Sequence, residues 1–145
     1  MGLFSRNKKE APQSAETTPA FEPLDGPYAE ICCAVSVSLD GKTHNIESDG
    51  SIRFYDGVVS VYAISARNQA KNLLRPVIVP NIAPVETLRY PYSEISRVFF
   101  ARKITAKVEF SDGKYAFFVI MNGGDRDRFT ALFTGHGVAV EPFKK

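Results

Sequence analysis

Apolar and polar positions alternate along most of the chain after residue 27, with the period of two that half-buried β-strands show. In the stretch 104–110, Ala106, Val108 and Phe110 share one face, while Thr105 and Lys107 belong to the other. The same pattern predicts further strands at 30–39, 51–55, 58–65, 94–101 and 114–121, and a short polar strand at 42–48. The chain is therefore predicted to form seven strands, four before residue 66 and three after residue 93.

The dipeptide Asp-Gly separates several of these predicted strands. It occurs at 40–41, 49–50, 56–57 and 112–113. Glycine tolerates a positive φ and aspartate hydrogen-bonds back to its own backbone, so Asp-Gly favours two-residue hairpin turns. The first three copies predict a four-stranded antiparallel meander over residues 29–65, and the fourth predicts a hairpin in the second group.

One amphipathic helix is predicted after the last of these strands. Phe129, Leu132 and Phe133 are spaced i, i+3, i+4 within residues 125–134, and Gly135 ends the segment. The strand at 114–121 is apolar on both faces, so each face needs a cover. We expect the helix to supply a cover, and the stretch 138–143 to add a short last strand.

Several stretches resemble a known family. "GSIRFYDGVVSVY" is similar to the strand-turn-strand of bacterial pleckstrin-homology-like (PH) and GRAM-type domains, and "YPYSEISRVF" resembles the start of their second sheet. "VEFSDGKYAFFV" resembles their later hairpin, and "DRFTALFTGHGVAV" their closing helix. The resemblance covers roughly residues 28–140. It implies a mainly β fold, a PH-like partly open barrel of about seven antiparallel strands (4+3) capped by a C-terminal helix.

The resemblance fails at the first predicted hairpin. PH domains that bind phosphoinositides resemble one another in a basic cluster there. In "SLDGKTHNIESDGS", Lys42 is the one basic residue, and Asp40, Glu47 and Asp49 oppose it. This charge balance argues against inositol-phosphate recognition at that hairpin. The PH fold hosts lipid binders, peptide binders and structural modules, so the resemblance alone does not decide function.

Length and composition predict one domain preceded by a tail. The chain has 145 residues, and residues 1–27 are rich in Pro, Ala, Thr and Glu without an apolar period. We predict a disordered N-terminal tail at 1–27 and a PH-like domain at 28–145. The longest apolar run, "AFFVIM", has six residues, so no transmembrane segment is expected. No signal peptide is recognised, and the predicted location is cytoplasmic, with peripheral membrane contact as an alternative.

The sequence shows no catalytic constellation. No nucleophile elbow, phosphate-binding loop or zinc-protease motif occurs, so we predict no enzyme and no cofactor. Cys32 and Cys33 are adjacent, and a strand would point their thiols to opposite faces. They are interpreted as two reduced strand residues, with a redox or metal pair as the alternative. His44 and His136 lie far apart in sequence, and no metal site is predicted.

Positive charge is concentrated in the middle of the chain. Residues 53–107 contain nine basic and three acidic residues, whereas the whole chain carries a net charge of +2. The long connection 66–92 begins with a helix-compatible piece, in which basic residues four apart lie beside apolar ones. Such a segment suits an acidic membrane or an amphipathic partner groove, and the alternative interpretation is that its apolar residues close the open corner of the barrel. The candidate partner-binding or anionic-surface-binding residues are Arg67, Lys71, Arg75, Leu73, Leu74, Arg97, Arg102 and Lys103.

Taken with the missing catalytic motifs, these features favour a binding protein. We predict a non-enzymatic PH-like interaction module that docks on a partner protein or on an acidic phospholipid surface. Two alternatives stay open at this point. One is a basic nucleic-acid-binding β-barrel, because interleaved basic and aromatic residues can track a backbone and stack bases. The other is a small-ligand carrier that uses the mouth of the barrel.

Overall fold

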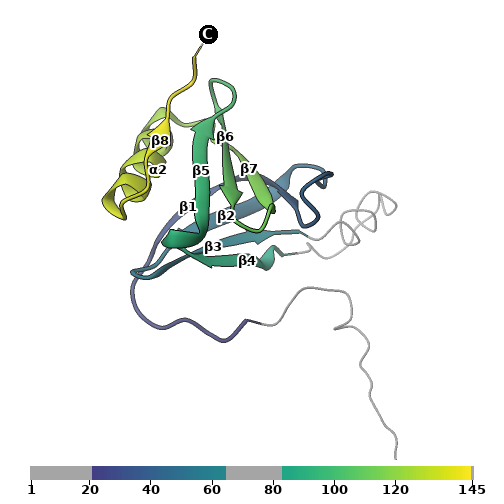
Figure 1. Cartoon of the computed structure of the whole chain (residues 1–145), viewed down its shortest axis with the longest axis vertical. Helices are drawn as coiled ribbons and strands as arrows, with labels where there is room; N and C mark the ends of the chain where they lie inside the picture. Colours follow the sequence, from purple (N-terminus) through teal and green to yellow (C-terminus); the bar gives the residue numbers. More distant parts are fainter. Residues whose placement is uncertain (1–20, 65–82, 145) are drawn as a thin grey trace, which may run out of the picture.

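The computed structural model describes residues 21–64 and 83–144. In these ranges eight strands form one sheet in the order β4-β3-β2-β1-β7-β6-β5-β8, and a helix follows β7 (Figure 1). The elements are β1 (Ala29–Ser38), β2 (Ser48–Phe54), β3 (Val58–Ala63), β4 (Val85–Pro91), the 3-10 helix η2 (Tyr92–Glu94), β5 (Ile95–Phe100), β6 (Thr105–Phe110), β7 (Tyr115–Val119), α2 (Gly123–Gly135) and β8 (Val140–Glu141).

The sheet consists of two antiparallel groups joined through β1. Strands β1 to β4 form one group and β5 to β7 the other, and β1 pairs with both β2 and β7. Strands β4 and β5 are consecutive in the chain but do not pair with each other, so the sheet stays open there (Figure 1). The predicted mainly β, partly open barrel of 4+3 antiparallel strands with a C-terminal helix is confirmed. The additional β8 is a two-residue strand parallel to β5.

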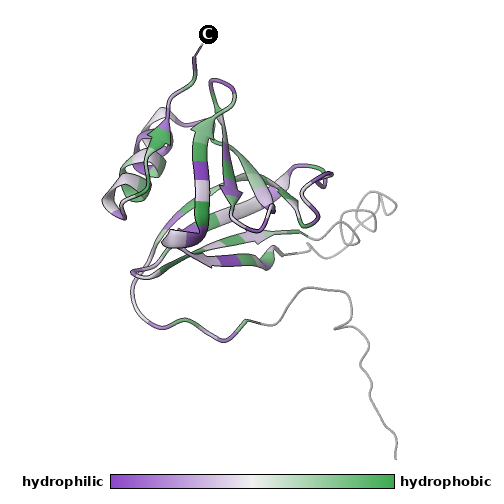
Figure 2. Ribbon diagram, viewed as in Figure 1, coloured by the Kyte–Doolittle hydropathy of each residue, from purple (hydrophilic) through white to green (hydrophobic). Residues whose placement is uncertain are grey.

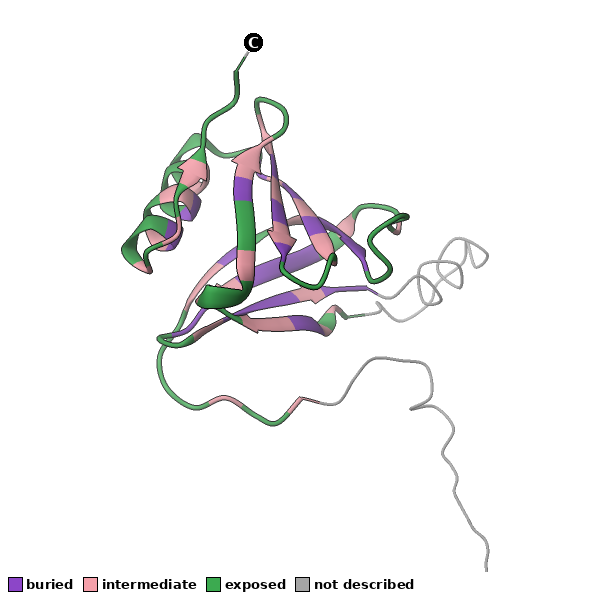
Figure 3. Cartoon of the chain, in the orientation of Figure 1, coloured by how far each residue is buried: buried purple, intermediate pink, exposed green. Residues whose placement is uncertain are grey.

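The core lies between the curved sheet and α2. Along β5, polar residues separate hydrophobic ones (Figure 2), and buried residues occur in each strand from β1 to β7 (Figure 3). Phe118 of β7 is fully buried against Phe129 of α2, with ring centroids 5.8 Å apart, and Phe133 packs edge-on to Phe54 at 4.9 Å. Burying each such ring contributes roughly 1.5–3 kcal/mol. The predicted helical stripe is confirmed, with helix bounds one or two residues wider than expected.

One strand of the first group was predicted wrongly. Residues 39–47 form a loop, so neither the strand predicted at 42–48 nor the hairpin turn predicted at 40–41 is present. The group's fourth strand is β4, inside the long connection. Asp40 organises this loop, because its Oδ1 accepts the backbone N–H groups of Lys42 at 2.8 Å and Thr43 at 2.9 Å. Leu39, the last residue of the strand predicted at 30–39, is 55 % exposed because β1 ends at Ser38.

The Asp-Gly pairs separate into two kinds. The pair at 56–57 joins β2 to β3, where the Tyr55 N–H donates to the Val58 carbonyl at 2.9 Å. The pair at 112–113 joins β6 to β7, with Gly113 at φ 94°. These two turns are confirmed. The turn predicted at 49–50 is wrong, because both residues lie within β2.

Side chains close the open corner between β4 and β5. The ring of Tyr90 stacks on Phe110 with centroids 4.0 Å apart, and its hydroxyl donates to Asp112 at 2.6 Å. Tyr92 stacks on His136, the C-cap residue of α2, at 4.0 Å and donates to the Tyr55 carbonyl. The corner is thus held by aromatic stacking and hydroxyl hydrogen bonds rather than by strand pairing.

Residues 21–28 reach the outer face of the first strand group. The guanidinium of Arg89 lies over the Phe21 ring at 4.8 Å, and that of Arg53 lies over the Tyr28 ring at 4.6 Å. Most of the predicted tail lies outside the described residues. Its boundary at residue 27 and its disorder therefore stay predictions.

Candidate functional site

Among the residues that the structure describes, most basic side chains in the middle of the chain are neutralised by carboxylates. Four of the six basic side chains that the structure describes between residues 53 and 107 form ion pairs at 2.7–3.0 Å. These pairs are Arg53–Glu30, Arg89–Glu86, Arg97–Glu141 and Lys107–Glu109. Within residues 21–64 and 83–144, Arg102 and Lys103 have no ion-pair partner.

The described part of the chain is acidic overall. It holds eleven basic and fourteen acidic residues, a net charge of −3, against +2 for the whole chain. The positive excess therefore belongs to residues outside the described ranges. Five of the predicted binding residues also lie outside those ranges, so their role stays a prediction: Arg67, Lys71, Leu73, Leu74 and Arg75.

The structure does not bring the other three predicted residues into one site. Arg97 on β5 is held by Glu141, and its guanidinium lies 3.9 Å from the centroid of the Phe99 ring. Arg102 and Lys103 share the β5–β6 turn, residues 101–104, but they line two different depressions. The depression at Arg102 is the larger and more polar of the two.

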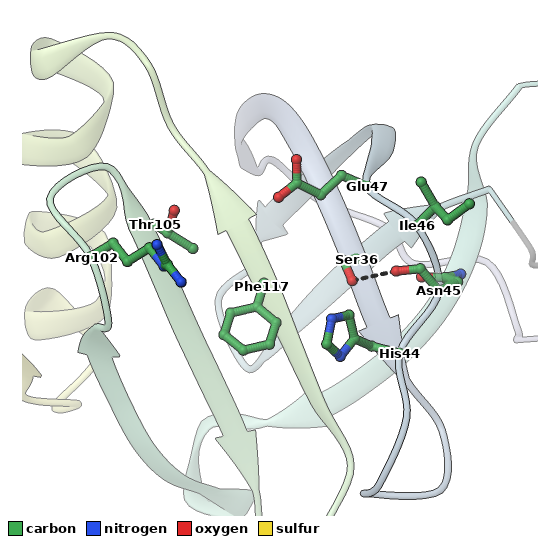
Figure 4. A pocket seen from close by; sticks show the side chains of 8 residues that line it. All are labelled: Ser36, His44, Asn45, Ile46, Glu47, Arg102, Thr105 and Phe117. Carbon is green, nitrogen blue, oxygen red and sulfur yellow. Dashed lines mark hydrogen bonds between the residues drawn. The ribbon is translucent and has the colours of Figure 1, made fainter.

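The depression at Arg102 lies between the 39–47 loop and the β5–β6 turn (Figure 4). Figure 4 shows the Arg102 side chain and His44 on either side of the Phe117 ring. The cavity has a volume of about 620 Å³ and is open to solvent. We call it the Arg102 depression, and its lining residues are Ser36, His44, Asn45, Ile46, Glu47, Arg102, Thr105 and Phe117.

Asn45 fixes the loop that forms one wall of the Arg102 depression. Its Oδ1 accepts the Val37 N–H at 2.8 Å, and its Nδ2 donates to the Ile64 carbonyl at 3.2 Å. The hydroxyl of Ser36 donates to the Asn45 carbonyl at 2.7 Å. These bonds tie the loop to β1 and to the end of β3. They also explain why Ser36, a polar residue on a strand, is only 1 % exposed.

A cluster of rings forms the neighbouring wall. His44 lies edge-on to Phe117, with centroids 5.2 Å apart, and its Nδ1 is 3.2 Å from the Tyr115 hydroxyl. The ammonium of Lys107 lies 4.3 Å from the centroid of Tyr115 and also pairs with Glu109. The rings are therefore held in place before any ligand arrives, which lowers the entropy lost on binding.

This set of groups suits binding rather than bond-breaking chemistry. Arg102 offers a planar cation, Phe117 and His44 offer ring surfaces, and Glu47 offers one carboxylate. Sequence reasoning selected Arg102 but missed His44 and Phe117. The outward position of Phe117 on β7 was readable from alternation, whereas the fold of the loop over it depends on tertiary contacts through Asn45.

The two cysteines have different surroundings. Cys32 is exposed, whereas Cys33 is half-buried against the core, which confirms that they face opposite ways. Burial, with a smaller contribution from Cys32, raises the pKa of the Cys33 thiol to about 12. A thiol with so high a pKa is a poor nucleophile at neutral pH. The environment of Cys33 therefore argues against a reactive pair, and reduction of both thiols stays a prediction.

Metal and membrane-spanning features were sought in residues 21–64 and 83–144. No group of three or more His, Cys, Asp or Glu side chains there could hold a metal ion. None of the helices in these ranges has the length and apolar character needed to cross a bilayer.

Comparison with known proteins gave structural likenesses only, to three solved chains. No family model and no curated protein sequence matches this chain. The chain is similar to the solution structure of the N-terminal PH domain of the human ARAP2 protein, with 10 % sequence identity and a TM-score of 0.44. The match covers 81 % of this chain and 84 % of that one.

Proposed function

We propose that this chain is a non-enzymatic interaction module that docks on a partner protein through the Arg102 depression. The observation that carries the proposal is that Arg102 is unpaired and lies beside aromatic rings in the described part of the chain. In the described part of the chain its guanidinium has no carboxylate partner, and it stands at the edge of a fixed wall of rings. Arginine and aromatic side chains in such positions dominate the binding energy of many protein interfaces.

The chemistry of the depression indicates the partner segment. A carboxylate on the partner can accept two parallel hydrogen bonds from the Arg102 guanidinium. An apolar or aromatic side chain beside that carboxylate can cover the exposed edge of the Phe117 ring. Glu47 on the rim disfavours a second acidic residue there. The proposed ligand is thus a segment with one acidic residue next to an apolar one.

An acidic membrane is less well supported. Near an anionic bilayer each basic residue contributes roughly 1 kcal/mol, and acidic residues oppose it. The described part carries a net charge of −3, and four of its six middle basic residues are already paired. Membrane docking would thus depend on Arg67, Lys71 and Arg75. The same charge balance disfavours a nucleic-acid-binding barrel.

A small-ligand carrier is also less well supported. Sites for small molecules usually enclose most of the ligand surface, whereas the Arg102 depression is open along the loop. The cytoplasmic location remains a prediction.

The test compares two adjacent charge reversals, Arg102→Glu and Lys103→Glu. Both residues lie in the same turn and carry the same charge, but Arg102 alone lines the depression. Partners captured from native cells by the unaltered chain are purified, and their affinities for each variant are measured. For a partner held at the Arg102 depression, we expect Arg102→Glu to weaken binding at least about tenfold. Lys103→Glu, at a residue that lines the separate cavity beside β8, should change the binding of that partner less than about twofold.

A parallel experiment uses liposomes with and without acidic phospholipid. The proposal expects no binding of the unaltered chain to either kind at physiological salt. Equal losses in both charge-reversal variants, together with binding to acidic liposomes, would instead identify a membrane surface and contradict the proposal.

A further inference from the structure

The chain's own C-terminal segment occupies a groove between β5 and α2. Strand β8 lies parallel to β5, with Val140 opposite Val98 and Glu141 opposite Phe99, and it also contacts α2 (Figure 1). Val140 packs partly against the core. The groove therefore accepts an extended chain, and β8 shows which side chains fit it.

The pairing of β8 is short because the end of α2 constrains the residues before it. The backbone N–H groups of His136, Gly137 and Val138 all donate to carbonyls of the last helical turn, at 2.9–3.0 Å. These residues cannot also pair with β5. As a result, β8 covers two residues of the six-residue strand β5. The outer edge of β5 at 95–97 has no strand partner within the described part of the chain.

The side-chain contacts of β8 are also partial. Glu141 receives two hydrogen bonds from Arg97, at 2.9 and 3.0 Å, but both side chains are about half exposed, at 50 % and 48 %. Ion pairs of this kind stabilise weakly. Phe143 remains 42 % exposed. A cavity of about 220 Å³ remains beside the C-terminal segment. It is lined by Phe100, Lys103, Arg126, Asp127, Thr130, Val140, Pro142 and Phe143.

We infer that the groove between β5 and α2 is a docking site for an extended segment of a partner protein, and that β8 occupies it only while no partner is bound. A partner segment is not tied to the end of α2, so it can continue the parallel pairing along residues 95–97. It can also fill the cavity that the C-terminal segment leaves empty. This surface is separate from the Arg102 depression, and the inference does not depend on the proposed function.

The contacts of β8 define the chemistry of the partner. An apolar, β-branched residue takes the place of Val140, and an acidic residue follows it directly to meet Arg97. An apolar or aromatic residue two positions later takes the place of Phe143. The recognised pattern is therefore apolar-acidic-x-aromatic, presented by a strand that runs parallel to β5.

The probes for the test are two labelled seven-residue peptides. One has the sequence of residues 137–143, GVAVEPF, and the other carries Lys in place of Glu, GVAVKPF. Full-length chains carry one of two substitutions. Glu141→Lys removes the ion pair that holds β8 to Arg97, and Arg97→Glu reverses the charge in the groove. Arg128→Glu is the matched control, because Arg128 is a half-exposed, ion-paired arginine on α2.

We expect GVAVEPF to bind Glu141→Lys at least about threefold more tightly than it binds the unaltered chain, because the competing strand β8 has lost its ion pair with Arg97. Arg97→Glu should prefer GVAVKPF, and Arg128→Glu should behave like the unaltered chain. Arg102→Glu should leave peptide binding unchanged, which separates this site from the Arg102 depression. Failure of both peptides to bind Glu141→Lys, or indifference to the charge at residue 97, would overturn the inference.

Hydrogen exchange of the unaltered chain provides a second measurement that needs no variant. If β8 leaves the groove readily, the amides of Ala139, Val140 and Glu141 exchange on the order of 100-fold faster than those of β6, through local opening. Equal protection of the two segments would show a permanently filled groove and would contradict the inference. Concentration-dependent dimers with no peptide binding would identify a second copy of the chain as the occupant, which also contradicts it.

Discussion

The substitution Gly50→Ala tests whether residue 50 lies within a paired strand. A Cβ added at Gly50 would stand 2.3 Å from the Tyr62 carbonyl oxygen and 2.8 Å from Cγ2 of Val35. The first of these atoms belongs to the backbone of β3, which cannot rotate away as a side chain can. Val35 is fully buried, so its movement is restricted as well.

The expected loss of stability follows from these contacts. Forcing one extra carbon into a packed interior destabilises by roughly 1–3 kcal/mol. Moving the Tyr62 backbone also weakens the pairing of Ser51 with Tyr62, and each lost hydrogen bond costs about 1 kcal/mol. The smaller entropy of the unfolded Ala chain offsets about 0.4–1 kcal/mol. The net destabilisation is therefore about 2–3 kcal/mol.

Urea unfolding followed by circular dichroism measures this change, because the chain has no tryptophan. The midpoint should fall by about 1–2 M relative to the unaltered chain. Gly57→Ala is the control. A Cβ there meets nothing within 4 Å, so its effect should stay within about 0.5 kcal/mol. If Gly50→Ala unfolds at the same urea concentration as Gly57→Ala, residue 50 is not in the paired strand and the register of β2 is wrong.

Two further predictions concern titratable groups. Burial alone raises the pKa of Glu86, but hydrogen bonds from Arg89 and Ser60 outweigh it and hold that pKa below its ordinary value of 4.5. A carboxylate with a lowered folded pKa stabilises above its unfolded pKa and loses this effect as pH falls through the folded value. The stability gap between the unaltered chain and Glu86→Gln in urea should therefore narrow between pH 7 and about pH 3, and a constant gap would refute the ion-pair account. In the native chain, iodoacetamide should modify Cys32 quickly and Cys33 slowly, because burial raises the pKa of Cys33 to about 12; equal rates, or fewer than two free thiols after unfolding without reductant, would contradict this.

Sequence periodicity predicted most of the strands because every second side chain in them points into the core. The alternation of Ala106, Val108 and Phe110 predicted their burial correctly. Strand β1 breaks its own alternation, because Ser36 and Ser38 are buried next to Val35 and Val37. This strand pairs with both groups, and the 39–47 loop covers its outer face. The spacing of apolar residues within the strand does not indicate that a loop buries the serines.

The identical Asp-Gly dipeptides show the limit of local turn signals. The pairs at 56–57 and 112–113 are turns, whereas the glycine at 50 lies in a strand where a side chain would strike β3. That need for space comes from a partner strand rather than from neighbours in sequence. Strand β4 was missed for a related reason, since it lies in a proline-containing connection for which no strand was predicted.

The candidate site was only partly predictable. The sequence identified a basic middle, but it did not show that Arg53, Arg89, Arg97 and Lys107 each meet a carboxylate. Three of those four carboxylates lie outside residues 53–107, so the charge count for the middle of the chain did not include them: Glu30, Glu109 and Glu141. Arg102 is distinguished by the absence of such a partner among the described residues. That property appears only when the strands are paired and the loop is in place.

Photo-crosslinking in native cells tests the proposed docking function most directly. A benzophenone amino acid replaces Phe117, whose side chain lines the Arg102 depression, and a control chain carries the same amino acid at Arg128 on α2. The proposal predicts one discrete protein adduct from position 117 on illumination, lost when Arg102→Glu is added and not formed from position 128. An adduct from position 117 that persists in Arg102→Glu, or none from position 117 in cells where the chain is bound to a partner, would contradict docking at this depression.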